Sequence, residues 1–266
     1  YKTVKGAFGK RLKSVMVPSQ DGECTFTLKE GGRCPFLNDD NLCDLYIELG
    51  EDKLCETCAE FPRFINDYGN IREIGIAPSC KTVGELMFSY KDELTFDTVE
   101  DNSLTPEPND IDAYTYMQLR QARIVAFGII SDRDISIFER LMLYLDYAKR
   151  IQKHLDAERD ELIAGVAKRF CGADYREKLL DKLKSRDAKL HGTRLIKGLR
   201  HFFDDFKGME VINPDWNIHV ARVRQFLDGL ADDSELAAVM KTYHERSDAF
   251  AHEYEQLAMY YVYRYM

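Results

Sequence analysis

Six of the seven cysteines lie within the first 80 residues, and their spacing is the feature of the sequence most able to do chemistry. Cys55 and Cys58 form a C-x-x-C pair, which lets two thiolates converge on one metal ion or one iron of a cluster. Cys34, Cys43 and Cys80 each stand beside a turn or a proline. Because thiolates select zinc, copper(I) or iron–sulfur clusters over hard cations, the sequence favours a metal or cluster site. The alternative is a set of reduced structural cysteines.

The composition excludes several other classes. Seven cysteines are an odd number, and the segment 1–6 is polar and basic with no apolar core behind it, so we expect neither a disulfide framework nor a signal peptide. No apolar run approaches the roughly 20 residues that a membrane-spanning helix needs. A net charge of −9 argues against general binding to nucleic acid. We therefore expect a cytoplasmic protein with reduced thiols, whose partners include neither a membrane nor a nucleic acid.

The residues around the cysteines show little regular structure. Residues 34–80 hold several turn signals and no long window with a helical period, whereas 24–28 alternates and predicts a short strand. A compact region of this kind needs something besides an apolar core to stabilise it, and a metal site commonly serves. We expect residues 1–90 to form a small, irregular cysteine-rich module that binds a metal or an iron–sulfur cluster.

The rest of the chain predicts helices. Residues 91–112 carry eight acidic residues and two prolines, which is typical of a linker. Residues 113–266 are expected to form an all-helical domain, so that the fold class is mainly α. Apolar residues recur at three- and four-residue steps in seven segments: 112–130, 134–155, 157–171, 174–190, 193–207, 216–231 and 234–265.

The cysteine region resembles a known family. It reads C-P-F-L-x-x-x-x-x-C from Cys34 to Cys43, then a leucine–glycine turn, then the C-x-x-C pair, then F-P-R at 61–63. This pattern resembles the flagellin lysine-N-methylase family, which is related to small zinc- or iron-chelating cysteine modules. The resemblance is strong over residues 24–90. It continues weakly through the helices to 254–265.

The resemblance implies an enzyme: a protein lysine N-methyltransferase that acts on flagellin. It implies an iron–sulfur cluster, 4Fe-4S with zinc as the alternative, and S-adenosylmethionine as the methyl donor. By motif position the cysteines that match the family's ligands are Cys34, Cys43, Cys55, Cys58 and Cys80. Cys24 does not match, and we expect it to be no ligand.

Two features limit what the resemblance implies. The sequence has neither the G-x-G-x-x-G of a Rossmann site nor a close C-x-x-x-C-x-x-C group, so the methyl donor rests on the family alone. Family members usually carry a further cysteine group and a tryptophan upstream of the position at which this chain begins. The chain could therefore be a truncated piece with an incomplete cluster, or a simpler ion could occupy its thiols. No residue is indicated as the catalytic base.

Other residues leave two interpretations open. Arg63 could hold an anionic group of a cofactor or substrate, such as a carboxylate, or it could bind carbonyls of the cysteine loop. The tyrosines near the C-terminus predict core or partner-facing packing, although aromatic residues could also line a site that desolvates a lysine amine. The basic stretch 176–200 predicts a solvated helix face. Cys171 is expected to be a buried structural cysteine at a helix end, with Gly172 as the stop.

Two further functions remain open besides the methyltransferase. The chain could be a non-catalytic zinc- or iron-chelating module fused to helices, which would handle metal or bind another protein. It could also be a helical scaffold with inert thiols. Metal content separates the first two from the third, and methylation of a flagellin lysine separates the first from the second.

Overall fold

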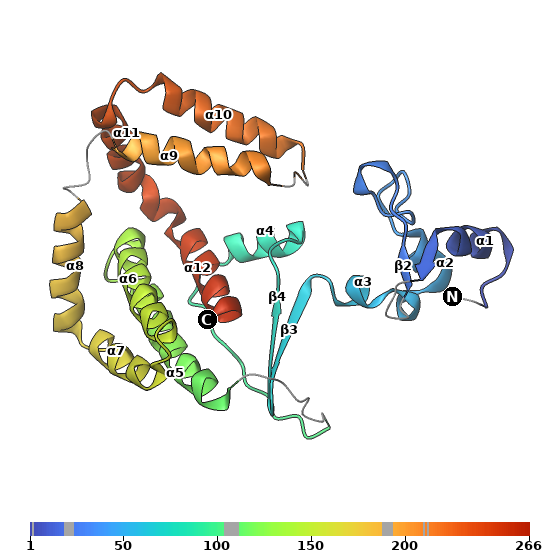
Figure 1. Cartoon of the computed structure of the whole chain (residues 1–266), viewed down its shortest axis with the longest axis horizontal. Helices are drawn as coiled ribbons and strands as arrows, with labels where there is room; N and C mark the ends of the chain where they lie inside the picture. Colours follow the sequence, from blue (N-terminus) through green and yellow to red (C-terminus); the bar gives the residue numbers. More distant parts are fainter. Residues whose placement is uncertain (2, 19–23, 104–111, 188–193, 210, 212) are drawn as a thin grey trace. The chain divides into compact units, whose positions relative to one another are not determined.

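The computed structural model describes residues 1, 3–18, 24–103, 112–187, 194–209, 211 and 213–266 (Figure 1). The chain divides into two compact units, Tyr1–Phe64 and Ile65–Met266. The first unit is shorter than the predicted module of residues 1–90, because residues 65–90 pack with the helices of the second unit. The predicted linker falls partly on residues 104–111, and two predicted helices fall partly on 188–193; these residues lie outside the described ones.

The first unit consists of short elements around a small apolar core. Its elements are α1 (Gly6–Val15), β1 (Met16–Pro18), β2 (Cys24–Phe26), η1 (Glu30–Gly32), α2 (Asp44–Leu49), η2 (Glu51–Lys53) and α3 (Glu56–Glu60). The strand predicted at 24–28 is confirmed as β2, which pairs antiparallel with β1. Leu12, Phe36 and Leu45 are the buried centre of the unit. So few fully buried side chains supply little apolar stabilisation, as in other small domains.

The second unit opens with a hairpin that the sequence analysis did not predict. Its strands are β3 (Arg63–Tyr68), which begins at the boundary between the units, and β4 (Ile71–Ile76). Gly69 and Asn70 alone join them, and Gly69 has a φ of +63°, a value that glycine adopts without steric cost. The hairpin leads through a short loop into α4 (Lys81–Ser89).

Most helices of the second unit enclose one large core. They are α5 (Ala113–Ile130), α6 (Ile137–Leu155), η3 (Asp160–Leu162), α7 (Ile163–Phe170), α8 (Ala173–Asp187) and α12 (Ala251–Tyr265). α12, red in Figure 1, packs against both α4 and α5. Tyr147 lies fully buried in this core, and its hydroxyl donates a 2.9 Å hydrogen bond to the carbonyl of Ala122. The prediction of a mainly α fold is confirmed.

The remaining helices pack mainly against one another. They are α9 (Arg194–Asp205), η4 (Phe206–Gly208), α10 (Asp215–Gly229), α11 (Asp233–Arg246) and η5 (Ser247–Phe250). α9 packs against α10 and α11, and Phe206 of η4 meets the Trp216 ring edge to face, with centroids 5.3 Å apart. Among the described residues no helix is both long and apolar enough to cross a membrane.

Local signals fix where several helices begin. The Asp112 carboxylate accepts a hydrogen bond from the Thr115 backbone N–H and so caps α5 at the end of the predicted linker. α10 begins at Asp215, one residue before the predicted segment 216–231, and Asp232 caps α11 just before the predicted segment 234–265. α6 begins at Ile137, inside the predicted segment 134–155, because Ser136 and Glu139 form a capping box there. The predicted helix 234–265 is two helices, α11 and α12, with η5 between them.

Candidate functional site

Cys34 and Cys43 are held at the two ends of a closed loop. Leu37 pairs with Cys43 in an isolated antiparallel bridge, and the Leu37 N–H donates to the Cys34 carbonyl at 3.2 Å. Within the loop, the Asn38 side-chain oxygen accepts hydrogen bonds from the backbone N–H groups of residues 40 and 42. The loop therefore brings two cysteines that are nine positions apart to one end of the small core.

Arg11 fastens this loop to the rest of the unit. Its guanidinium donates to the Asp44 carboxylate at 2.6 Å and to the Pro35 carbonyl at 2.5 Å. Asp44 directly follows one cysteine of the loop, and Pro35 directly follows the other. One arginine from α1 thus holds the segments that carry both thiols.

Cys55 and Cys58 lie at the start of α3, in the same region. Cys55 is the N-cap of α3, and its carbonyl accepts the Cys58 N–H at 2.9 Å. Leu54 packs against the core next to Cys34 and Cys43, which places the start of α3 beside the loop. α3 ends at Glu60, two residues before Pro62, which cannot continue a helix.

Cys58 interacts electrostatically with three other thiols. The pKa of Cys58 is raised to about 11. Burial of the thiol group is the largest cause, although the residue as a whole is exposed. The hydrogen bond with Cys55 and the charges of Cys55, Cys34 and Cys43 add to this rise. Cys34, Cys43, Cys55 and Cys58 therefore share one neighbourhood, which we call the cysteine quartet. Thiolates that repel one another are stabilised when a soft cation lies between them.

The quartet fits a metal or a cluster by donor type. Four thiolates are the complete ligand set of a tetrahedral zinc ion or of an iron–sulfur cubane. Its geometry is not preformed: within the described ranges no three His, Cys, Asp or Glu side chains are arranged around a common metal position. The right donors are thus gathered, and ligand geometry would be completed by the metal that binds.

The other predicted site residues lie elsewhere. Cys80 is the N-cap of α4 in the second unit, so its place in the ligand set stays a prediction. Arg63 is exposed at the start of β3, and its guanidinium makes no hydrogen bond or ion pair to the described part of the chain. Cys24 is exposed in β2. Cys171 caps the end of α7, as predicted, but its expected burial is wrong: the residue is exposed, because it lies one position beyond the buried Phe170.

Tyr1 borders the quartet and was not singled out from the sequence. Burial raises the pKa of its hydroxyl, and the charges of Cys55, Cys58 and Cys43 raise it further. The hydroxyl donates to the Lys53 carbonyl, and the ring packs on Phe26. Arg11 was missed as well, because nothing in the basic sequence around it marks one arginine as the partner of a loop 24 residues away.

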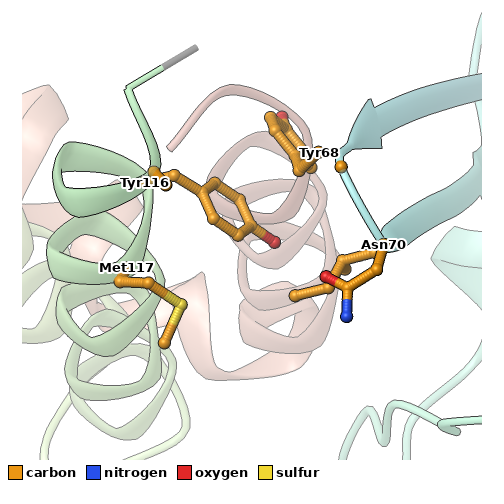
Figure 2. Close-up of a pocket in the computed structure, with 7 residues that line it drawn as sticks. Tyr68, Asn70, Tyr116 and Met117 are labelled. Carbon is orange, nitrogen blue, oxygen red and sulfur yellow. The ribbon is translucent and has the colours of Figure 1, made fainter. Parts of the chain in front are cut away.

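A small pocket lies within the second unit, between the turn of the hairpin and the first turns of α5 (Figure 2). Its volume is about 200 Å³, and most of its surface is apolar. Tyr68 and Asn70 line it from the hairpin, and Tyr116 and Met117 line it from α5. The rings of Tyr68 and Tyr116 stack with centroids 4.3 Å apart and planes 20° apart.

A buried ion pair stabilises the two elements that form the pocket. The Arg123 guanidinium and the Glu73 carboxylate are both buried, and Nη1 of the arginine lies 2.8 Å from Oε2. Arg123 also donates to the Tyr263 carbonyl at 3.1 Å, and the Tyr263 hydroxyl donates to the Ile74 carbonyl. These contacts tie the hairpin to α5 and α12.

The tyrosines of the pocket remain neutral phenols. Burial raises the pKa of Tyr116 to about 12, and the Glu73 charge adds to the rise. Burial and the same charge raise the pKa of Tyr68. Neither tyrosine supplies a tyrosinate base near neutral pH.

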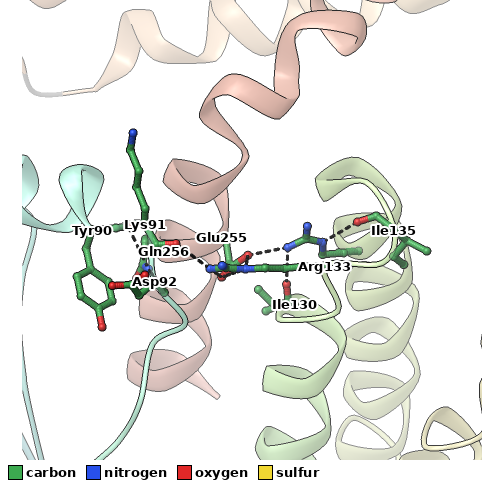
Figure 3. A network of polar contacts seen from close by, with 9 residues as sticks. Tyr90, Lys91, Asp92, Ile130, Arg133, Ile135, Glu255 and Gln256 are labelled. Atoms are coloured by element: carbon green, nitrogen blue, oxygen red, sulfur yellow. Dashed lines mark hydrogen bonds and ion pairs between the residues drawn. The ribbon is translucent and has the colours of Figure 1, made fainter.

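A second buried network joins α12 to α6 and to the end of α4 (Figure 3). The Glu255 carboxylate accepts hydrogen bonds from Arg140 at 2.6 Å and from Arg133 at 2.7 Å. Arg133 also donates to the Lys91 carbonyl, and the Gln256 amide donates to the Asp92 carbonyl. Its donors end on backbone carbonyls and on one carboxylate, so we interpret this network as structural.

The C-terminal tyrosines, the basic stretch and His252 form no further site among the described residues. In the C-terminal helix Met259 is buried in the core, whereas Tyr261 and Tyr265 are exposed. Of the basic stretch, Lys184 and Arg200 pair with acidic residues of neighbouring helices, and Arg176 pairs with Asp132 in the loop between α5 and α6. Lys189 and His191 lie outside the described residues. The His252 ring bonds to the Phe88 carbonyl at 2.9 Å.

Comparison with known proteins identifies the C-terminal part of the chain. Residues 123–266 match the FliB lysine N-methylase C-terminal domain. The chain therefore belongs to the FliB lysine N-methylase family. It is 32% identical over 63 residues to a flagellar biosynthetic protein, FliU of Salmonella muenchen, which is 24% of this chain and 37% of that protein. The chain thus matches well under half the length of that relative. No solved structure matches the chain.

Proposed function

We propose that the chain acts as a protein lysine N-methyltransferase that methylates lysine side chains of flagellin. The observation that carries this proposal is the match of residues 123–266 to the C-terminal domain of a lysine N-methylase family. The flagellar name of the FliU relative supports flagellin as the substrate. The resemblance of the cysteine region supports the same family independently, since it involves residues outside that match.

The cysteine quartet is proposed to hold an iron–sulfur cluster of the 4Fe-4S type, with zinc as the alternative. Four thiolates in one neighbourhood are a full ligand set for either group. Arg11 would keep the loop of Cys34 and Cys43 in place, and α3 would present Cys55 and Cys58 to the same centre. When bound, a cluster of this kind supplies one-electron chemistry.

S-adenosylmethionine is proposed as the methyl donor on the strength of the family alone. Within the described residues the sheets have two strands each, so the donor would not lie on a doubly wound parallel sheet there. Arg63 is the residue that we propose for its carboxylate. The guanidinium is exposed, it is not engaged within the described residues, and it follows the C-x-x-C pair closely in sequence.

The test is a methylation assay with the full chain, loaded with iron and sulfide under exclusion of oxygen. Purified flagellin is incubated with the protein, a reductant and S-adenosylmethionine that carries an isotope label in its methyl group. Mass spectrometry then locates label on lysine residues. We expect labelled lysine with the unaltered chain and with Cys171→Ser, because Cys171 is an exposed cysteine of the second unit.

Two results would decide against the proposal or part of it. Absence of labelled lysine from a chain with full iron and sulfide content would refute the methyltransferase. The Cys55→Ser/Cys58→Ser variant is expected to lose labelling together with its metal. If that variant methylated flagellin normally, the quartet would not serve the reaction.

The chelating module is the second candidate function, and one observation favours it. The family match begins at residue 123, so the cysteine quartet lies outside it. A quartet that bound zinc tightly, in a chain that left flagellin unmodified, would establish a metal-binding module in place of the enzyme.

A further inference from the structure

We infer that the pocket between the β3–β4 turn and α5 receives the aliphatic side chain of the substrate lysine. This inference rests on the proposed function and goes beyond it, because it assigns the site that recognises the substrate. Its walls are Tyr68 and Asn70 on one side and Tyr116 and Met117 on the other (Figure 2).

The size of the pocket decides which reactant it can take. Sites for cofactors and drug-sized ligands have volumes of roughly 300–1,000 Å³. The present pocket has about 200 Å³, which is too small for a nucleoside-containing donor. A single unbranched side chain fits a space of this size. The pocket therefore suits the acceptor and not the methyl donor.

The lining suits the hydrocarbon part of lysine. The surface is mainly apolar. Tyr68 and Tyr116 cover each other with one ring face each, and the remaining ring surface and the adaptable side chain of Met117 offer contacts to a chain of methylene groups. Lysine commonly packs its methylenes on such surfaces while the amine reaches a polar edge. Asn70 and the tyrosine hydroxyls are the polar groups at that edge.

None of the described residues that line the pocket carries a carboxylate. Glu73 is bound to Arg123, and Asp67 accepts from Arg72 at 2.6 Å. Tyr116 interacts more strongly with the negative charge of Glu73 than with the positive charges of Arg120 and Arg123. Burial in the pocket favours the neutral form of an amine, whereas the Glu73 charge favours the ammonium ion. We therefore assign the pocket to recognition of the lysine side chain and not to removal of its proton.

The pocket is rigid enough to select a side chain. The stacked tyrosines fix its wall, and the buried pair of Glu73 and Arg123 fixes the hairpin against the helices. A site built in this way loses little entropy when it binds, which favours selective recognition.

The first arm of the test measures binding to the full chain without any turnover. Nα-acetyl-lysine N-methylamide is titrated into protein with ring-labelled tyrosine, and NMR follows the Tyr68 and Tyr116 signals, assigned with Tyr68→Phe and Tyr116→Phe. The glutamate analogue of the probe is the comparison ligand. We expect saturable shifts with the lysine probe and affinity at least tenfold weaker for the glutamate probe.

A variant that fills the pocket supplies the second arm. Met117→Trp, at a partly exposed position on α5, should weaken the lysine probe at least tenfold and leave the helical circular dichroism unchanged. Met209→Trp, at an exposed methionine remote in sequence, should bind the probe normally. Shifts that do not saturate, equal binding of the two probes, or normal binding to Met117→Trp would each overturn the inference.

The two proposals fail in different ways. If the unaltered chain methylates flagellin and Met117→Trp does so with the same KM, the pocket is not the lysine site, and the methyltransferase stands. If the unaltered chain binds the lysine probe in the pocket but never methylates flagellin, the methyltransferase fails, and so does the assignment of the bound lysine as its substrate.

Discussion

Glu255 shows how the second unit handles a buried charge. Its side chain is 3% exposed, and that of its partner Arg140 is 6% exposed. Removal of one member of such a pair leaves the other buried and uncompensated, which costs about 3–5 kcal/mol. We therefore expect Glu255→Ala to lower the free energy of unfolding by about that amount in urea titrations.

An exposed ion pair provides the matched control for that variant. Lys81 and Glu85 lie 3.7 Å apart on α4, and both are largely exposed. Glu85→Ala should change the free energy of unfolding by no more than about 0.5 kcal/mol, since solvent screens the pair. Equal effects of the two substitutions would contradict the structural role of the Glu255 network.

The buried hydroxyl of Tyr147 should make the free energy of unfolding depend on pH in the alkaline range. Burial raises the pKa of its hydroxyl above the ordinary value of about 10. A raised pKa in the folded state stabilises the fold fully below pH 10, and this stabilisation is lost as the pH rises towards the folded-state pKa. Tyr147→Phe should cost about 1 kcal/mol at neutral pH through the lost hydrogen bond to Ala122.

Unfolding measured from pH 7 to pH 11 checks this expectation. The difference between the unaltered chain and Tyr147→Phe should shrink above pH 10, because the phenylalanine variant has no proton to lose there. A difference that is constant over the whole range would show that Tyr147 ionises equally in the folded and unfolded states.

At the residue scale the sequence predicts the donors of the candidate site and not their supports. Thiol chemistry and the C-x-x-C spacing identify Cys55 and Cys58, since both signals are local. Arg11 and Glu73 act through partners 33 and 50 positions away, and such pairs become visible only when the chain is folded. The pocket is hidden for the same reason, because two different elements form its walls.

At the scale of elements, the start of α6 offers a direct test of local stabilisation. The Ser136 side chain accepts from the Glu139 N–H, and the Glu139 carboxylate accepts from the Ser136 N–H at 2.8 Å. Loss of a capping hydroxyl costs about 1 kcal/mol. Ser136→Ala should lower the free energy of unfolding by this amount. Ser185→Ala, at an exposed serine within α8, should be neutral or slightly stabilising, because alanine is the better helix former.

Helices were predictable from the sequence, and the hairpin was not. α6 is long and amphipathic, and α5 is long and rich in apolar residues at helical spacing, so both could be recognised as helices. In β4 the isoleucines at 74 and 76 are exposed and the buried residue is Glu73, so the strand carries no apolar alternation to detect. The break between α11 and α12 was missed too. Neither glycine nor proline marks it, and a buried Ser247 bonded to the His244 carbonyl sits there instead.

At the scale of the whole molecule, the two units differ in what stabilises them. The first has a buried centre of three residues, whereas the core of the second extends over five helices. If the quartet holds a metal, that metal should contribute a large share of the stability of residues 1–64 and little to residues 65–266.

Metal removal from the full chain tests this difference. After chelation, limited trypsin digestion should cut the first unit faster at its nine lysines and arginines, while the helical circular dichroism and the main thermal transition change little. The Cys55→Ser/Cys58→Ser variant should resemble the chelated protein without treatment. Equal protection of residues 1–64 with and without metal would contradict a structural contribution of the quartet.

The most direct measurement for the central claim is the metal and acid-labile sulfide content of the full chain, purified without oxygen, beside the Cys55→Ser/Cys58→Ser variant. The account predicts iron with sulfide and a broad absorption band in the unaltered chain, and their loss from the variant. Zinc without sulfide would favour the chelating module over the cluster-containing enzyme. Absence of metal from both proteins would contradict the assignment of the cysteine quartet as a metal centre.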